Sequence, residues 1–173
     1  MRSLTLALVA VGVAGICGFS SAADKPKESG AKACFERIKK LAGDWVTVDE
    51  KSGKETTMLK YRVIAGGSAV EESIMPGEAH EMVTVYHMDG PSLMLTHYCA
   101  VGNQPRMKAT PTSTPAKIEF KCVGVSNVKS HNDMHMHHGL LTFASDDAMV
   151  TEWTGVDNGK PGHAVKFNVK RKK

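Results

Sequence analysis

Apolar and polar residues alternate in short runs from Trp45 to the end of the chain, and turn residues interrupt the runs about every ten positions. Runs rich in Val, Thr, Tyr and Met between Gly, Pro, Asn and Asp are typical of β-strands joined by tight turns. The loops leave no room for a helical crossover, so the strands are expected to form an antiparallel meander. Ten strands are predicted, at residues 45–50, 56–64, 68–75, 81–88, 93–100, 105–110, 116–124, 135–144, 147–155 and 163–171.

So many consecutive strands favour closure into a barrel, because an open sheet leaves an edge that promotes aggregation. The predicted fold is all-β: a single ten-stranded antiparallel up-and-down barrel with a short N-terminal helix. Alternation along the strands predicts which side chains face the interior, although a shift of one residue would exchange the two faces. The predicted interior residues include Ile118, Phe120, Cys122, Val165, Phe167, Val169 and, in one hairpin, Met82, Thr84, Tyr86, Leu93, Leu95, His97 and Cys99.

Three segments are predicted to differ from one another: a signal peptide at residues 1–22, a flexible linker at 23–33 and the barrel domain at 34–173. Within the domain, "ACFERIKKLAGDW" predicts one short helix, because Phe35, Ile38 and Leu41 recur at a spacing of three. Gly43 is expected to end this helix.

The N-terminus has the arrangement of a secretory signal: an arginine, an apolar run from Leu4 to Phe19, and then small residues. The run of about 16 residues is shorter than the roughly 20 that span a bilayer, which favours cleavage after Ala22 or Ala23 over a membrane anchor. Lipidation at Cys17 is an alternative, although the preceding Ile is bulky. We therefore expect an exported protein, periplasmic or secreted.

The charge and the cysteine content indicate little about the function. The net charge is +4, the basic excess lies near the chain ends, and aromatic residues make up only 6%, so nucleic-acid binding is not expected. Cys34, Cys99 and Cys122 remain after cleavage, and a bridge between the last two is possible. No CxxC, HExxH, Gly-x-Ser-x-Gly or phosphate-binding loop is present, so no catalytic residue is assigned.

The chain resembles the calycin superfamily, which includes the lipocalins, the fatty-acid-binding proteins and nitrobindin-like haem proteins. The helix leading into "LAGDW" is similar to the Gly-x-Trp start of lipocalins, in which the Trp closes the base of the barrel. "YRVIAGGSAVEE", "HEMVTVYHMDG", "LTHYCAVGNQPRM" and "EWTG" look more like uncharacterised bacterial lipocalin-like domains. The resemblance covers roughly residues 35–171. It implies a barrel with an internal cavity, and haem is a minor option.

The stretch "SHNDMHMHHG" holds four of the eight histidines of the chain. His135 and His137 are in phase with Leu141 and Phe143, so both are expected to face the cavity, while His138 and Met136 point outward. Together with His97 they could supply three ligands for zinc or copper, with Cys99 as a conceivable fourth. The alternative is that these histidines are ordinary polar strand residues.

The leading prediction is an exported module that binds a small apolar or amphipathic molecule. Polar groups at the barrel mouth would orient it: Tyr86, His97, Arg106, His135 and His137. The alternatives are a zinc or copper protein, or a metal-dependent enzyme, built on His97, His135 and His137, and a filled barrel that acts as an interaction domain.

Overall fold

The computed structural model describes residues 30–173. The predicted signal peptide and most of the predicted linker therefore lie outside the described residues. A helix precedes ten strands in the described part, and a single turn of 3-10 helix, η1 (Ala65–Gly67), joins the second strand to the third. The elements are α1 (Gly30–Lys39), β1 (Gly43–Val48), β2 (Glu55–Ile64), β3 (Ala69–Ile74), β4 (Met82–Asp89), β5 (Ser92–Tyr98), β6 (Gln104–Ala109), β7 (Lys117–Ser126), β8 (His135–Phe143), β9 (Ala148–Asp157) and β10 (Lys160–Arg171).

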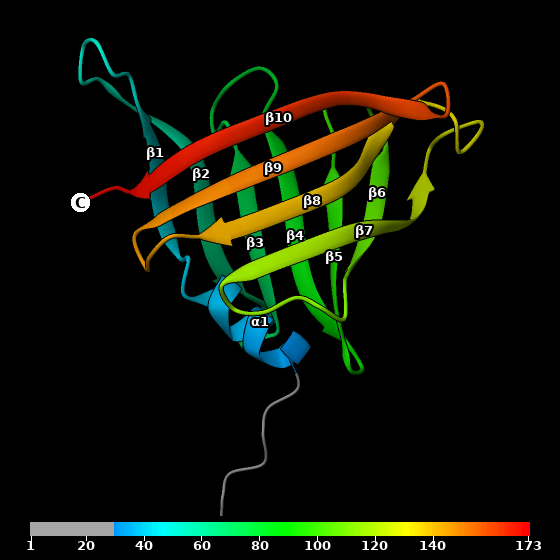
Figure 1. Cartoon of the computed structure of the whole chain (residues 1–173), viewed down its shortest axis with the longest axis horizontal. Helices are drawn as coiled ribbons and strands as arrows, with labels where there is room; N and C mark the ends of the chain where they lie inside the picture. Colours follow the sequence, from blue (N-terminus) through cyan, green and yellow to red (C-terminus); the bar gives the residue numbers. More distant parts are fainter. Residues whose placement is uncertain (1–29) are drawn as a thin grey trace, which may run out of the picture.

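The ten strands form one closed antiparallel barrel, as the alternation pattern predicts (Figure 1). Each strand pairs with its neighbours in sequence, and β1 pairs with β10 to close the sheet. The barrel is compatible with a calycin-like fold. Closure leaves no free sheet edge among the described strands, which removes the aggregation hazard of an open meander.

Helix α1 lies across one end of the barrel (Figure 1). Its apolar stripe is buried: Phe35 and Ile38 are 4% and 0% exposed. The helix begins at Gly30, inside the range described above as a linker, and it ends before Gly43, which has a positive φ of 123°. Within residues 30–173, no helix is long and apolar enough to span a membrane.

Trp45 closes the barrel at the same end. Its ring is fully buried, and its Nε1 donates a hydrogen bond of 2.8 Å to the carbonyl oxygen of Leu41. The guanidinium of Arg171 lies over the Trp45 ring, 4.7 Å from its centroid. The Gly-x-Trp motif therefore sits where the helix, the first strand and the last strand meet.

The interior faces agree with the predicted alternation. In the hairpin of β4 and β5 the register pairs Thr84 with His97 and Tyr86 with Leu95, so these side chains point the same way. Interior residues of this hairpin and of β7 are at most 2% exposed: Thr84, Tyr86, Leu93, Leu95, His97, Ile118 and Phe120. The predicted register of this hairpin is thus confirmed.

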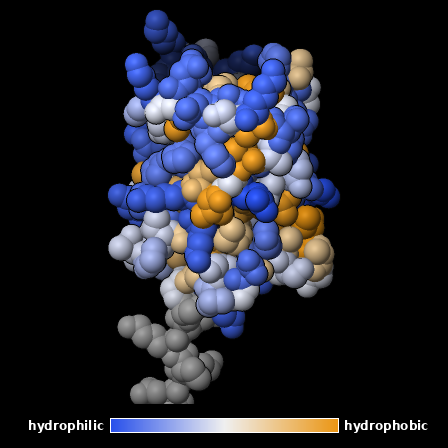
Figure 2. Space-filling model, turned by 90° about the vertical axis from the view of Figure 1, so that its right-hand side faces the viewer, coloured by the Kyte–Doolittle hydropathy of each residue, from blue (hydrophilic) through white to orange (hydrophobic). Residues whose placement is uncertain are grey.

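One face of the outer surface is mainly polar. Figure 2 shows one face of the barrel, on which hydrophilic side chains predominate and hydrophobic ones form small separate patches. Scattered apolar residues of this kind are normal on the surface of a globular protein. This face therefore offers no broad apolar docking surface.

Candidate functional site

Strand β8 departs from regular alternation at His137. Its neighbours Met136 and His138 pair with Gly155 and Thr154 of β9, two consecutive residues, so His137 is an extra residue and forms a β-bulge. Met136 consequently lines an interior cavity, and the expectation that it points outward is wrong. His138 does point outward, and its Nε2 lies 2.9 Å from Oε1 of Glu119.

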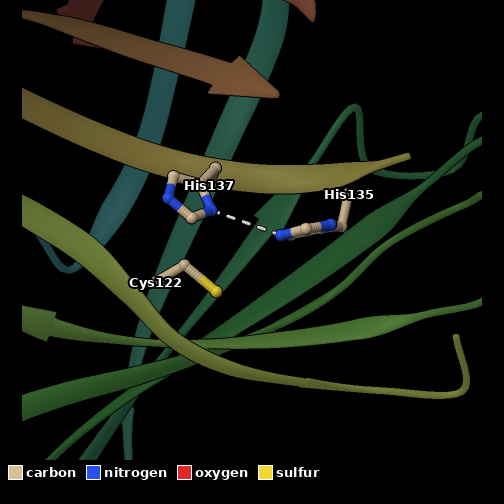
Figure 3. A group of neighbouring side chains, drawn as sticks. All are labelled: Cys122, His135 and His137. Carbon is tan, nitrogen blue, oxygen red and sulfur yellow. Dashed lines mark hydrogen bonds between the residues drawn. The ribbon is translucent and has the colours of Figure 1, made fainter. Parts of the chain in front are cut away.

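Cys122, His135 and His137 form a group whose potential ligand atoms all lie within 4.8 Å of one another. The pairing of β7 with β8 ends at Lys121 and His138, and beyond this point the strands separate. Figure 3 shows the two histidines of β8 pointing across the gap toward the cysteine of β7. Nε2 of His135 and Nδ1 of His137 are 3.3 Å apart.

A backbone contact orients the ring of His135. Its Nδ1 lies 2.7 Å from the carbonyl oxygen of Asp133, and a carbonyl can only accept, so Nδ1 carries the hydrogen. Nε2 then carries a lone pair, which faces Nδ1 of His137 and lies near Cys122. A hydrogen bond of this kind, made by the ring nitrogen that does not bind the metal, usually fixes the tautomer of a metal-ligating histidine.

The two histidines of the group differ in exposure. His135 is 2% exposed, whereas His137 is open to solvent. Burial lowers the pKa of His137, and the imidazoles of His135 and His138 lower it further. Burial raises the pKa of the Cys122 thiol, and the nearby Arg106 guanidinium opposes this. The His137 imidazole is thus biased toward the neutral, ligating form, whereas the Cys122 thiol must lose its proton to bind a metal.

His97 lies outside this group. Its Nδ1 is 2.9 Å from Oγ1 of Thr84, and its ring stacks on Trp153 with centroids 5.3 Å apart. Burial lowers the pKa of His97 to about 4, so the ring is neutral at pH 7. The structure therefore brings together two of the three predicted metal ligands, His135 and His137, and places Cys122 beside them.

An apolar cavity of about 190 Å³ lies at the end of the barrel opposite α1. The connection between β3 and β4 contributes to it, whereas α1 contacts β4 and β5 at the other end. His97 is the one titratable side chain in its lining within the described part of the chain. The lining residues are Ile74, Met75, Met82, His97, Met136, Trp153, Val165 and Phe167.

The other residues predicted to orient a ligand do not line this cavity: Tyr86, Arg106, His135 and His137. Tyr86 is fully buried, and its hydroxyl donates a hydrogen bond of 2.6 Å to Oε2 of Glu72. Arg106 is exposed and lies opposite Thr96 of β5. Leu95 and His97 on either side of Thr96 face the interior, so Thr96 and Arg106 face outward. The Arg106 guanidinium therefore lies on the outer surface, over Gly124.

Glu72 is a buried interior residue that was not predicted to belong to a site. It is 0% exposed, and hydroxyls of Tyr61 and Tyr86 each donate a 2.6 Å hydrogen bond to one of its carboxyl oxygens. Burial raises the pKa of Glu72, and the hydroxyl groups act in the opposite direction. The signal that could have revealed it is the antiparallel register, which places Glu72 opposite the inward-facing Thr84.

The cysteines of the described residues are all free, so the bridge considered between Cys99 and Cys122 is not formed. Cys34 is buried on α1. The Cys122 sulfur instead lies within 4.8 Å of ring nitrogens of His135 and His137.

Comparison with known proteins adds no relative: no protein-family model matches the chain, and no curated protein matches it. Because function depends on particular sites rather than on the fold, the cavity and the three-residue group are the features from which a function is inferred.

Proposed function

We propose that the protein is a binding module for a small apolar or amphipathic molecule. The observation that carries this proposal is the cavity of about 190 Å³, whose lining is apolar except for His97. Ligand sites are typically concave and mostly apolar, with a few polar groups that set orientation. An engineered apolar cavity of about 150 Å³ binds benzene, so a ligand of one or two rings suits this volume.

Titration with indene, an apolar two-ring probe, tests the proposal. Calorimetry should show saturable binding close to one molecule per chain. Val165 lines the cavity, so Val165→Trp should fill it and abolish binding. Glu152→Gln changes an exposed side chain outside the lining and should leave binding unchanged. Equal binding by the Val165→Trp variant would place the probe elsewhere and refute the proposal.

A second candidate function is the binding of a transition metal by Cys122, His135 and His137. The observation that favours it is the convergence of one sulfur and two imidazole nitrogens within 4.8 Å. Two imidazoles and a thiolate suit zinc or copper, and three protein ligands leave a fourth position for water. Ligand atoms around one zinc ion lie roughly 3 to 4 Å apart, so the side chains must close slightly, and the exposed His137 ring has room to rotate.

Elemental analysis of protein purified without a His-tag, followed by titration with zinc and with cobalt, tests this second function. Cys122→Ser and His137→Ala should each abolish stoichiometric binding, and Cys122→Ser should also remove the thiolate-to-cobalt absorption. His138→Ala and Cys99→Ser are the matched controls and should bind as the unchanged chain does, because neither residue belongs to the group. Loss of the metal in His97→Ala, with retention in Cys122→Ser, would support the originally predicted ligand set instead.

A further inference from the structure

Three methionines and one histidine line the apolar cavity: Met75, Met82, Met136 and His97. They come from four separate segments of the chain, namely the β3–β4 connection, β4, β8 and β5. Thioether sulfur and neutral imidazole nitrogen are both ligands for soft metal ions. Among residues 30–173, no carboxylate, thiol or lysine side chain contributes to this wall, so the potential ligand atoms are all uncharged.

The strand register places two of the methionines near His97. Met82 of β4 lies two residues before Thr84, which is opposite His97 of β5, so Met82 and His97 are diagonal neighbours on the inner face. Ile74 of β3 is opposite Met82, and Met75 follows Ile74 directly. These two thioethers therefore flank the histidine from adjacent strands.

Trp153 connects His97 with the third methionine across the barrel. The rings of His97 and Trp153 stack with their centroids 5.3 Å apart. Met136 of β8 is opposite Gly155 of β9, which is two residues from Trp153. Met136 therefore approaches the same ring pair from the opposite wall.

The three cavity methionines differ from methionines that only fill the core. Met107 and Met149, which pack in the interior, are 0% and 2% exposed, whereas the cavity methionines are half-buried. Met75 also has a positive φ of 54°, a left-handed conformation that glycine adopts without strain. The chain thus carries a thioether at a position whose backbone favours glycine.

One ring nitrogen of His97 is open to the cavity. Nδ1 lies 2.9 Å from Oγ1 of Thr84, whichever of the two donates, and Nε2 has no hydrogen-bond partner among the described residues. A metal on Nε2 leaves the hydrogen on Nδ1, where the Thr84 oxygen can accept it. Because burial lowers the pKa of His97 to about 4, no proton competes with a metal for the ring at pH 7.

We propose that this cavity binds one soft monovalent cation, Cu(I) or its analogue Ag(I), through Met75, Met82, Met136 and His97. Thioether ligands select Cu(I) over harder ions. The uncharged wall favours a single charge, because desolvation costs more for a divalent ion and no carboxylate or thiolate of the wall offsets it. Mg²⁺ and Ca²⁺ require oxygen ligands, which the side chains of the wall do not supply.

This methionine–histidine site is separate from the group of Cys122, His135 and His137. It does not rest on the proposed small-molecule function, although it uses the same cavity.

Silver titration of a chain that carries Cys99→Ser and Cys122→Ser tests the proposal, because accessible thiols would otherwise capture the metal. Neither cysteine lines the cavity. One equivalent of Ag(I) should shift the methyl resonances of the three cavity methionines in a carbon-13 spectrum. Met94, on the outer face of β5, should not shift. Cu(I) added without oxygen should give the same pattern.

Leucine substitutions then measure what each thioether contributes. Met82→Leu and Met136→Leu should each weaken Ag(I) binding at least tenfold in competition calorimetry, because each removes a ligand while conserving volume. Met94→Leu is the matched control and should leave the affinity unchanged. Urea unfolding verifies that each variant is folded. An excess of Zn(II) should not displace Ag(I).

Two results would overturn the proposal. Equal Ag(I) affinity in Met82→Leu, Met136→Leu and Met94→Leu, or unshifted methyl resonances, would show that the cavity methionines serve packing alone. Displacement of Ag(I) by Zn(II) would refute selection of a soft monovalent ion. Indene binding is measured independently, so its failure refutes the small-molecule function and leaves the methionine–histidine site to be judged by the silver data.

Discussion

His97 is a neutral imidazole held between a hydroxyl group and an indole ring. Thr84 binds its Nδ1, Trp153 stacks on its face, and burial lowers its pKa from 6.5 to about 4. The same burial that suits the ring to an apolar cavity makes its protonation unfavourable. The protonation of His97, a residue of the cavity wall, therefore affects the stability of the fold.

This coupling predicts a loss of stability in acid. Between about pH 4 and 6.5 the unfolded chain binds a proton at His97 that the folded chain does not, so the free energy of unfolding falls as the pH falls. A shift of this size corresponds to about 3 kcal/mol. Glu72, whose pKa is raised, contributes with the opposite sign.

Urea unfolding at both ends of that pH window should show a smaller change in stability for His97→Gln than for the unchanged chain. An identical pH dependence in both proteins would mean that folding does not lower the pKa of His97.

At the scale of elements, the bulge in β8 places consecutive side chains in different surroundings. Met136 lines the cavity, His137 belongs to the three-residue group, and His138 binds Glu119 on the outer face. A regular strand would alternate two faces only. Because of the extra residue, adjacent side chains of one strand belong to the cavity wall and to the candidate metal-binding group.

Gly139 of β8 allows the Trp153 ring to approach the strand. The two residues are opposite each other, and a Cβ at position 139 would lie 3.1 Å from Cζ3 of the indole. Gly139→Ala should displace the Trp153 ring, destabilise the protein by about 1 to 3 kcal/mol and weaken indene binding. Urea unfolding and calorimetry measure the two effects, with the surface substitution Lys121→Ala as control. Unchanged indene affinity would show that the ring position does not shape the cavity.

The closed barrel depends at its base on one residue near the C-terminus. The Arg171 guanidinium donates to the carbonyl oxygens of Lys40 and Ala42 at 2.8 and 2.9 Å, binds the Asp147 carboxylate and covers the Trp45 ring. These contacts join the end of β10 to the segment between α1 and β1. They therefore hold β10 against the segment that covers this end of the barrel.

Arg171→Ala should consequently lower the free energy of unfolding by about 1 to 3 kcal/mol, because it removes two hydrogen bonds to backbone carbonyl groups and the cation that covers the buried Trp45 ring. Lys170→Ala is the matched control: it removes an exposed ion pair with Glu55, worth about 0 to 1 kcal/mol. Urea unfolding compares the two. Equal losses would show that the contacts of Arg171 add nothing beyond surface charge.

The predicted signal peptide leads to an expectation about the whole chain. The apolar run and the small residues after it should direct export and cleavage after Ala22 or Ala23. N-terminal sequencing of the protein recovered from the periplasm or medium should therefore begin at Ala23 or Asp24. Recovery of a soluble chain that retains Met1 would contradict export.

The strands and their order could be predicted because the alternation of side chains with a period of two is a local property of each run. Short turns then leave neighbouring strands little choice but to pair in sequence. The inward faces of Thr84, Tyr86 and His97 followed from the same reasoning, and the structure confirms them. The apolar spacing of Phe35, Ile38 and Leu41 likewise predicted the helix.

The membership of the candidate sites was not predictable in this way, because it depends on the register between strands. A bulge at His137, a second irregularity beside Cys122 and the separation of β7 from β8 bring those two residues together. The role of Glu72 likewise depends on hydroxyls from two other strands. Alternation tells which way a side chain points, whereas only the folded register determines which side chain it meets.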